Sequence, residues 1–435
     1  MIRYSFCLIF MIALSAAAAT FADVRSGSGP AVAEWPQWRG PLRDGKSSDT
    51  GLIANLPESG PPVLWKASGL GAGFSSISIA DGRIFTMGER GEDQFVIALS
   101  LADGRELWRT KIGAKWKDGN YSGPRGTPTV DGDLLYAVGT YGDLICAETK
   151  TGKVHWKKNF QTDFGGQMMS GWGFSESPLV DGNKLLCTPG GKQAAIVALD
   201  KKGGRLLWKA AVPDLGPKGK DGAAYSSIVV SEAAGTRQYV QLLGRGVVGI
   251  DANTGKFLWG YNKITNPTAA IPTPIPHGDY IFCTSGYGDG GAAVLKIVKH
   301  AKQFEAEEIW YHPAKELQNH HGGAVLVGEY LYFGHGHNKG IPVCVEFLTG
   351  RIVWEGDKRP PGSGSAAVVF ADGNVYYRYQ DGVVALIGAT PEGYQLKGTF
   401  TIPNVEKPSW PHPVVLDGKL YIREQDALIC YNVKA

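Results

Sequence analysis

The chain has 435 residues, a formal net charge of +3 and 20% charged residues, and its lysines and arginines form no continuous run. Because nucleic-acid binding requires a concentrated basic face that displaces counterions, we exclude nucleic acid as a partner. An apolar share of 43% is enough for a large folded core, so the chain is not expected to be disordered.

The N-terminus has the organisation of a secretory signal peptide. Arg3 gives a positive start, residues 5–14 form a short apolar stretch, and residues 16–22 supply small side chains for cleavage. The apolar stretch is shorter than the roughly 20 residues that span a bilayer, and no later stretch is long enough, so we expect no transmembrane segment. Cys7 lies inside this stretch without a small-residue cleavage site before it, so no lipid anchor is evident.

These features predict a signal peptide at residues 1–22 and a periplasmic or secreted location for the mature protein. Residues 23–34 contain Ser-Gly-Ser-Gly-Pro and are interpreted as a flexible linker. The rest of the chain, residues 35–435, is expected to form one domain.

Aromatic residues that follow a turn glycine recur through this domain at intervals of 43 to 52 residues. A period of this size is typical of a propeller or a solenoid. The recurring residues are Trp65, Trp108, Trp156, Trp208, Trp259, Trp310 and Trp354, and Phe400 takes the same place after the last of them.

Each repeat contains the signals of four strands. An apolar strand reaches a turn such as Asp131-Gly132, and a second and a third strand follow, the third being, for example, Ile196-Val197-Ala198-Leu199. A further turn such as Thr254-Gly255 leads to the strand that carries the tryptophan. Asp-Gly favours a two-residue hairpin because glycine tolerates positive φ. Four antiparallel strands make one propeller blade.

The repeats count to seven complete blades and an eighth with only three strands, which ends at Tyr431. The N-terminal strand Val63-Leu64-Trp65-Lys66 supplies the missing fourth strand. The sequence therefore predicts an all-β, eight-bladed β-propeller with four-stranded antiparallel blades, closed by this strand. Since closure removes the free sheet edge, we expect a monomer.

The cysteines follow the repeat rather than a disulfide framework. Five cysteines remain after Cys7, and an odd number in an exported chain does not suggest pairing. Free cysteine behaves as a small buried side chain, so we expect buried thiols. Cys146, Cys344 and Cys430 occupy the third-strand position that holds Ala98, Ala198, Gly249 and Ala385 in other blades.

The loops that lead into the inner strands and those that follow the second strands lie on one face of a propeller, around one mouth of its channel. Ligands bind at such mouths, where loops vary over a fixed scaffold. Aromatic and polar side chains there suit a flat ligand, a sugar or a peptide, or simply fill the channel. The candidate ligand-binding residues are Tyr121, Arg125, Trp172, Glu176, Tyr225, Asp289, Trp410 and His412.

A second cluster is formed by the histidines of blade 6. His320 and His321 precede its inner strand, and His335 and His337 follow its second strand. Neutral imidazole is the commonest metal ligand, so these four could hold Zn²⁺ or Cu²⁺. The alternative is that they are surface or channel-lining side chains.

The recurring Ala-Leu-Asp, Thr-Gly-Lys and Leu-Trp pattern resembles the pyrroloquinoline quinone (PQQ) repeat of quinoprotein alcohol dehydrogenases. The opening Trp35-Pro36-Gln37-Trp38-Arg39-Gly40 resembles the lead-in of exported PQQ-like propellers. The same architecture resembles the BamB-type scaffolds of outer-membrane protein assembly, which are not enzymes. The resemblance implies the fold over about residues 35–433 and leaves the activity open.

Several departures argue against the redox chemistry of the family. The chain has no adjacent cysteine pair and no Cys-x-x-Cys-His motif. The dehydrogenases bind Ca²⁺ through a Glu in an early loop, and the corresponding residues 188–193 contain no carboxylate. Tyr225 stands where the family has a tryptophan under the quinone, and Asp289 is the one acidic residue near another Ca²⁺ position of the family.

We therefore expect a non-catalytic exported binding or assembly scaffold with a protein or polymer partner and no cofactor. One alternative is a PQQ-dependent alcohol dehydrogenase with PQQ and calcium. The other is a metal- or carbohydrate-binding propeller.

Overall fold

The computed structural model describes residues 33–117, 121–405 and 407–435. These residues form 32 strands, one short helix α1 (Phe160–Phe164) and one 3-10 turn (Ala233–Gly235). No helix among them has the length and apolar character needed to cross a membrane. The predicted signal peptide at 1–22 and positions 23–32 of the predicted linker lie outside the described residues.

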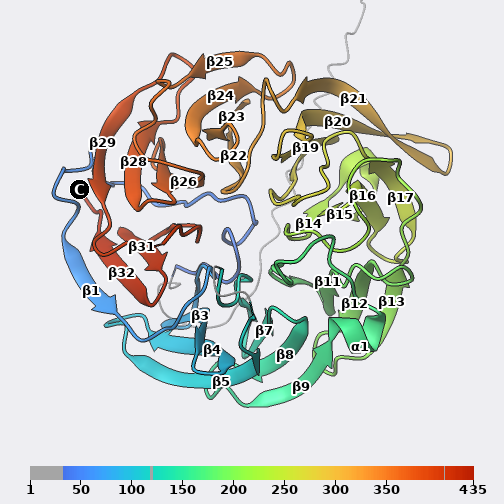
Figure 1. Ribbon diagram of the computed structural model, residues 1–435, viewed down its shortest axis with the longest axis horizontal. Helices are drawn as coiled ribbons and strands as arrows, with labels where there is room; N and C mark the ends of the chain where they lie inside the picture. The colour runs from blue at the N-terminus through green and yellow to red at the C-terminus, as the bar shows by residue number, and fades with distance from the viewer. Residues whose placement is uncertain (1–32, 118–120, 406) are drawn as a thin grey trace, which may run out of the picture. The chain divides into compact units, whose positions relative to one another are not determined.

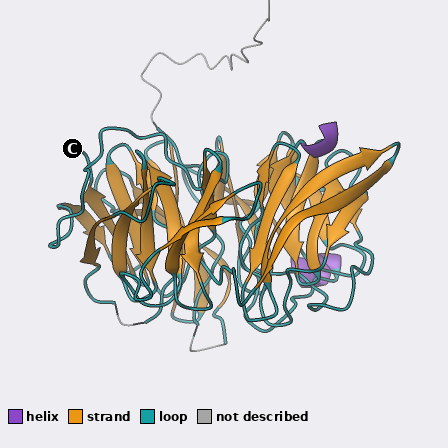
Figure 2. Ribbon diagram, turned by 90° about the horizontal axis from the view of Figure 1, so that it is seen from above, coloured by secondary structure: helices purple, strands orange, loops and turns teal. Residues whose placement is uncertain are grey.

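The strands form eight four-stranded antiparallel sheets, the blades, which stand around a central channel (Figure 1). Figure 2 shows these strands running between two faces that carry the loops. Blades 1 to 4 contain β2 (Ser78–Ala80), β3 (Arg83–Arg90), β4 (Asp93–Ser100) and β5 (Glu106–Ala114); β6 (Thr129–Asp131), β7 (Leu134–Val138), β8 (Asp143–Glu148) and β9 (Val154–Asn159); β10 (Leu179–Asp181), β11 (Lys184–Cys187), β12 (Ile196–Asp200) and β13 (Leu206–Ala210); β14 (Val229–Ser231), β15 (Gln238–Leu243), β16 (Gly246–Asp251) and β17 (Phe257–Tyr261). Blades 5 to 8 contain β18 (Ile275–His277), β19 (Tyr280–Ser285), β20 (Gly291–His300) and β21 (Gln303–Pro313); β22 (Ala324–Val327), β23 (Tyr330–His335), β24 (Ile341–Glu346) and β25 (Ile352–Glu355); β26 (Ala366–Ala371), β27 (Asn374–Tyr379), β28 (Val383–Gly388) and β29 (Leu396–Thr401); β30 (Val414–Leu416), β31 (Lys419–Glu424) and β32 (Ala427–Asn432), completed by β1 (Val63–Ala67).

The eighth blade confirms the predicted closure. Its strand order is β1-β32-β31-β30, so the N-terminal strand is the outer strand of the C-terminal blade. Val63 pairs with Tyr431 and Lys66 pairs with Ile429 in an antiparallel register. The two ends of the domain therefore hold the ring closed through backbone hydrogen bonds.

The inner hairpins of the blades other than blade 4, whose β14 and β15 are joined by the six residues 232–237, turn in two ways. At Asp81-Gly82 both residues have positive φ, as expected for an Asp-Gly turn. At Asp131-Gly132 the prediction was wrong by one residue, because Asp131 pairs with Leu134 and the two turn residues are Gly132 and Asp133. Gly132 there has φ of +59° at the first turn position, which glycine adopts without steric cost. Both forms are two-residue hairpins.

The third-strand cysteines lie opposite the outer tryptophans. Cys146 pairs with Trp156 and Cys344 pairs with Trp354 across the two outer strands of their blades. All five described cysteines are buried and free, as predicted. Burial raises the pKa of the Cys146 thiol to about 11, so this group is an apolar packing element rather than a reactive thiolate.

Each outer tryptophan packs on a turn glycine of the next blade in most of the ring. A Cβ at Gly350 would lie 2.6 Å from the ring of Trp310, and a Cβ at Gly152 would lie 2.5 Å from the ring of Trp108. The indole Nε1 of Trp310 also donates to the backbone oxygen of Phe347 at 2.8 Å. The tryptophan period of the sequence therefore marks the contact that joins neighbouring blades.

Residues 35–47 run across the inside of the ring before β1 begins (Figure 1). Trp35 forms an isolated β-bridge with Ile79 of blade 1, and the backbone N–H of Phe370 in blade 7 donates to Gly45. Between these points the buried guanidinium of Arg43 donates to the backbone oxygens of Ser177 and Ile228. This segment therefore connects inner strands that are distant in sequence.

Candidate ligand site at the channel mouth

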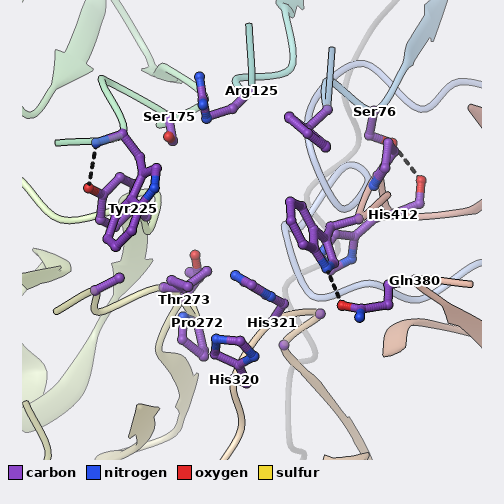
Figure 3. A pocket seen from close by; sticks show the side chains of 18 of the residues that line it. Ser76, Arg125, Ser175, Tyr225, Pro272, Thr273, His320, His321, Gln380 and His412 are labelled. Atoms are coloured by element: carbon purple, nitrogen blue, oxygen red, sulfur yellow. Dashed lines mark hydrogen bonds between the residues drawn. The ribbon is translucent and has the colours of Figure 1, made fainter. Parts of the chain in front are cut away.

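A cavity of about 380 Å³ occupies the channel mouth, among the loops that lead into the inner strands and those that follow the second strands (Figure 3). Cavities of this size, with mainly apolar walls and a few convergent polar groups, are typical of ligand sites. Its aromatic lining consists of Trp38, Phe74, Tyr121, Trp172, Tyr225, Tyr287 and Trp410, and its histidines are His320, His321, His337 and His412.

The structure brings most of the predicted site residues to this one cavity. Nine of the twelve candidates line it, namely Tyr121, Arg125, Trp172, Tyr225, Trp410, His412, His320, His321 and His337. The remaining three, Glu176, Asp289 and His335, are not among its lining residues.

Glu176 lies below the lining. Its side chain is 3% exposed, and its Oε1 accepts from the backbone N–H of Thr188 at 2.5 Å. Its Oε2 has no partner among the described residues, and burial raises its pKa to about 7. Glu176 therefore anchors the loop after β11 through its bond to Thr188.

Asp289 and His335 point elsewhere. Asp289 is exposed in the loop between β19 and β20, and its backbone oxygen accepts from the Lys218 ammonium at 3.1 Å. The Nδ1 of His335 lies 3.2 Å from the backbone nitrogen of Gln318. Their positions in the repeat predicted that both residues would lie at the cavity, but neither side chain lines it.

One wall of the cavity is a continuous series of rings. The centroid of His320 lies 4.3 Å from that of His337 and 4.0 Å from that of His321. His321 lies 4.8 Å from Trp410, and Trp410 lies 5.0 Å from Phe74. Tilted ring pairs at these separations are favourable contacts, so the wall is a packed aromatic surface.

Hydrogen bonds fix the orientation of this wall. The Nδ1 of His320 lies 3.0 Å from the Ser365 hydroxyl, and Trp410 Nε1 donates to Gln380 Oε1 at 2.9 Å. Figure 3 shows this last bond beside His412.

A buried ion pair supports the loop that carries Trp410. The guanidinium of Arg378, which is fully buried, donates to the backbone oxygen of Ser409 and pairs with Glu424. A buried charge of this kind must keep its partners, because an unpaired charge in the interior is costly. Arg378 thereby fixes the backbone beside Trp410.

Tyr225 and Trp172 stand on the opposite side of the cavity from His412 (Figure 3). The Tyr225 hydroxyl lies 2.7 Å from the Ser170 hydroxyl and accepts from the backbone N–H of Trp172 at 3.3 Å. Ser170 in turn donates to the backbone oxygen of Thr268 at 2.6 Å. Rings therefore face the cavity from two sides.

Three histidines of the cavity, His320, His321 and His412, are uncharged at neutral pH. Burial, and then the neighbouring His337, lowers the pKa of His320 to about 3. Burial, and then Arg39, lowers the pKa of His412 to about 3, and burial also holds the pKa of His321 well below its ordinary value. The lining contains the cation Arg125, whose guanidinium donates to the backbone oxygen of Tyr121 at 2.7 Å.

The donor set does not fit a calcium-bound quinone. Among the residues that the structure describes, the lining includes no aspartate or glutamate, whereas Ca²⁺ in proteins takes several oxygen ligands that usually include carboxylates. Within residues 33–117, 121–405 and 407–435, no three His, Cys, Asp or Glu side chains are placed to share a metal ion. With His335 apart from the stacked rings of His320, His321 and His337, the four predicted ligands do not converge.

A row of hydroxyls was missed by the sequence analysis. The backbone N–H of Ser76 donates to Thr127 Oγ1 at 3.2 Å, and that of Thr127 donates to Ser177 Oγ at 2.9 Å. The N–H groups of Ser177 and Ser227 donate in the same way to Ser227 Oγ and Thr273 Oγ1. We name Thr127, Ser177, Ser227 and Thr273, all of which line the cavity, the hydroxyl arc.

The hydroxyl arc had a sequence signal. Its members recur two residues before β6, β10, β14 and β18, at the same position of four successive repeats. A search for hydroxyl residues at one repeat position would have found them. Their bonds to the preceding blade appear only in the folded ring.

Fold and site together define a PQQ-like β-propeller with a pocket at its channel mouth, whose described lining residues are largely aromatic and include no carboxylate. A family model described as outer membrane protein assembly factor BamB matches residues 92–356, and the chain belongs to this family. A curated relative from Nitrosomonas eutropha (strain DSM 101675 / C91 / Nm57), outer membrane protein assembly factor BamB, is 24% identical over 292 residues. That match covers 66% of this chain and 62% of the relative, which is less than two thirds of the relative's length.

Solved structures with the same fold include a BamB and a quinohemoprotein alcohol dehydrogenase. BamB from Moraxella catarrhalis superimposes with a TM-score of 0.60 at 13% identity, covering 86% of this chain and 99% of that chain. Quinohemoprotein alcohol dehydrogenase from Comamonas testosteroni superimposes with a TM-score of 0.63 at 12% identity, covering 92% and 81%. Because identities this low establish the fold alone, the function must be argued from the site.

Proposed function

We propose that this protein is an exported, non-catalytic scaffold that holds a protein or polymer partner at its channel mouth. Membership of the BamB family supports a role in assembly or binding, since the family description names an assembly factor. The aromatic cavity supports the mouth as the place of binding, because rigid aromatic side chains dominate binding surfaces.

The observation that carries the proposal is that the described residues lining the cavity include no aspartate or glutamate. A PQQ-dependent alcohol dehydrogenase, which the fold also accommodates, would need calcium ligands at this mouth. Glu176 is buried below the lining and Asp289 is exposed outside it, so neither residue supplies a carboxylate to the cavity.

The first test is a titration of the purified mature protein with PQQ, with and without Ca²⁺, followed by tryptophan fluorescence. We expect no saturable calcium-dependent quenching and no reduction of an artificial dye in the presence of alcohols. Calcium-dependent binding in the micromolar range or tighter, together with dye reduction, would establish the dehydrogenase instead.

The second test locates the partner by crosslinking in the producing cells. A photoreactive amino acid at Tyr121, which is 38% exposed at the mouth, should give a discrete adduct with the partner. The same amino acid at Leu206, which is 40% exposed on outer strand β13, is the matched control and should give none. Adducts from both positions, or from Leu206 alone, would remove the mouth as the binding site.

A further inference from the structure

The segment of residues 35–47, which we name the plug, lies inside the ring below the mouth cavity (Figure 1). Its two ends bridge to Ile79 of blade 1 and Phe370 of blade 7, which stand beside the turns of their inner hairpins. These turns lie on the face opposite the mouth, because each strand of a blade reverses the direction of the one before. Between its ends the plug reaches the cavity, where Trp38 is a lining residue. The plug therefore occupies the channel between the opposite face and the cavity.

The plug is folded on itself and is joined to the ring by little backbone pairing. The backbone N–H of Gly45 donates to the oxygen of Arg39 at 2.9 Å, which closes the middle of the plug into a loop. The side-chain amide of Gln37 donates to the oxygen of Pro41 and accepts from Arg43 Nε, both at 2.8 Å. The backbone pairing with the ring consists of isolated β-bridges rather than a strand ladder. Such a segment moves as a unit without breaking a sheet.

Two buried arginines attach the plug to the inner strands. The guanidinium of Arg43 donates to the backbone oxygens of Ser177 and Ile228 at 3.0 and 2.9 Å, and that of Arg39 donates to the backbone oxygen of Ala324. Among the described residues neither guanidinium forms an ion pair, so carbonyl oxygens alone hold both charges in the interior. Burial lowers the pKa of Arg39 to about 10 and that of Arg43 to about 9.

The docked plug carries two energetic costs that its withdrawal removes. Arg39 and Arg43 have φ of +62° and +57°, in the left-handed region that is unfavourable for residues other than glycine. A buried charge without an opposite charge beside it adds a desolvation cost, which the buried pair of Arg378 and Glu424 in the blades offsets. Withdrawal of the plug should therefore require less free energy than the unfolding of a blade.

We propose that the plug is displaceable: it withdraws from the channel as one unit while the eight blades stay folded. Withdrawal removes Trp38 from the lining and joins the cavity to the opposite face of the ring. This conformational step goes beyond the proposed function and does not depend on which partner the mouth holds.

The test is hydrogen exchange of the full mature protein, followed at single amides by fragmentation mass spectrometry. Two groups of amides are bonded across the boundary between plug and ring: Trp35 and Ser47 donate from the plug, and Ile79, Val130 and Phe370 donate from the ring. We expect both groups to exchange at one common rate, at least about a hundredfold faster than the amides of β23. Different rates for the two groups would mean local fraying and would overturn withdrawal as a unit.

Guanidinium chloride below its denaturing concentration distinguishes withdrawal from unfolding of the ring. The dependence of an opening reaction on denaturant scales with the surface that the opening exposes. Exchange at β23 should therefore accelerate steeply, and exchange at the plug should accelerate little. Exchange of both plug groups at the β23 rate, with the same dependence on denaturant, would overturn the proposal.

A substitution of Arg43 tests the attachment of the plug. Arg43→Lys keeps the charge but loses the planar fork that reaches two carbonyl oxygens, so exchange at the plug should accelerate at least about tenfold while β23 stays unchanged. Arg423→Lys is the matched control, because Arg423 is a buried arginine outside the plug that donates to the backbone oxygen of Gly71 at 2.8 Å. Plug exchange that is unchanged in Arg43→Lys, or equally accelerated in Arg423→Lys, would contradict the proposal.

Discussion

The outer rim of this propeller repeats one side-chain contact from blade to blade, whereas the side chains at the channel mouth differ between blades. At the rim one contact recurs, in which a tryptophan such as Trp108 or Trp310 covers a turn glycine of the next blade. At the mouth the blades differ, with hydroxyls from blades 2 to 5 and stacked rings, such as His320 and Trp410, from blades 6 and 8. Repetition therefore serves ring stability, and departure from the repeat provides the chemistry of the site.

The largest loss of stability should come from removing a tryptophan of the outer rim. Trp310→Ala removes a large ring and leaves a cavity over Gly350, and should lower the free energy of unfolding by about 3 kcal/mol. Equilibrium denaturant unfolding measures this loss as a lower midpoint. The partner crosslink at Tyr121 should stay unchanged, and its loss in the folded variant would contradict the separation of rim and mouth.

A smaller effect on stability should come from the titration of a histidine at the channel mouth. The folded pKa of His320, about 3, lies below its ordinary value of 6.5, so this group contributes stability that is complete above pH 6.5 and is lost as the pH falls towards 3. The slope is about 1.4 kcal/mol per pH unit for one such group. His320→Gln should reduce the pH dependence of unfolding between pH 6.5 and 5 by roughly this slope.

The comparison with the variant is needed because another buried group acts in the opposite direction. Burial raises the pKa of Glu176 from 4.5 to about 7, so its contribution is complete below pH 4.5 and is lost as the pH rises through 7. The difference between the native protein and His320→Gln removes this background. An identical pH dependence in both proteins would show that His320 is solvated in the folded state.

The smallest effect on stability should come from the hydroxyl arc. Ser227→Ala removes the acceptor of the Ser177 N–H bond, and a single such bond contributes about 1 kcal/mol. The midpoint of thermal unfolding should therefore change little. A stability loss as large as that of Trp310→Ala would mean that the arc is a structural element like the rim.

The sequence alone determined the propeller, its eight blades, the closure by the strand at Val63 and the burial of cysteines such as Cys146. These features follow from local periodicity, because each blade is built from neighbouring residues and repeats its turn and packing signals. It also placed Trp172, Tyr225 and Trp410 on the right face, since strand order within a blade fixes which loops share an end.

Only the tertiary structure decided which of those residues meet in one cavity. Glu176 and Asp289 occupy plausible repeat positions, yet one is buried against Thr188 and the other is exposed, because side-chain direction depends on neighbouring blades. The path of residues 35–47 inside the ring and the bonds between arc residues such as Ser227 and Thr273 join segments that are far apart in sequence. Such contacts carry no local signal, because they exist only once the ring has closed.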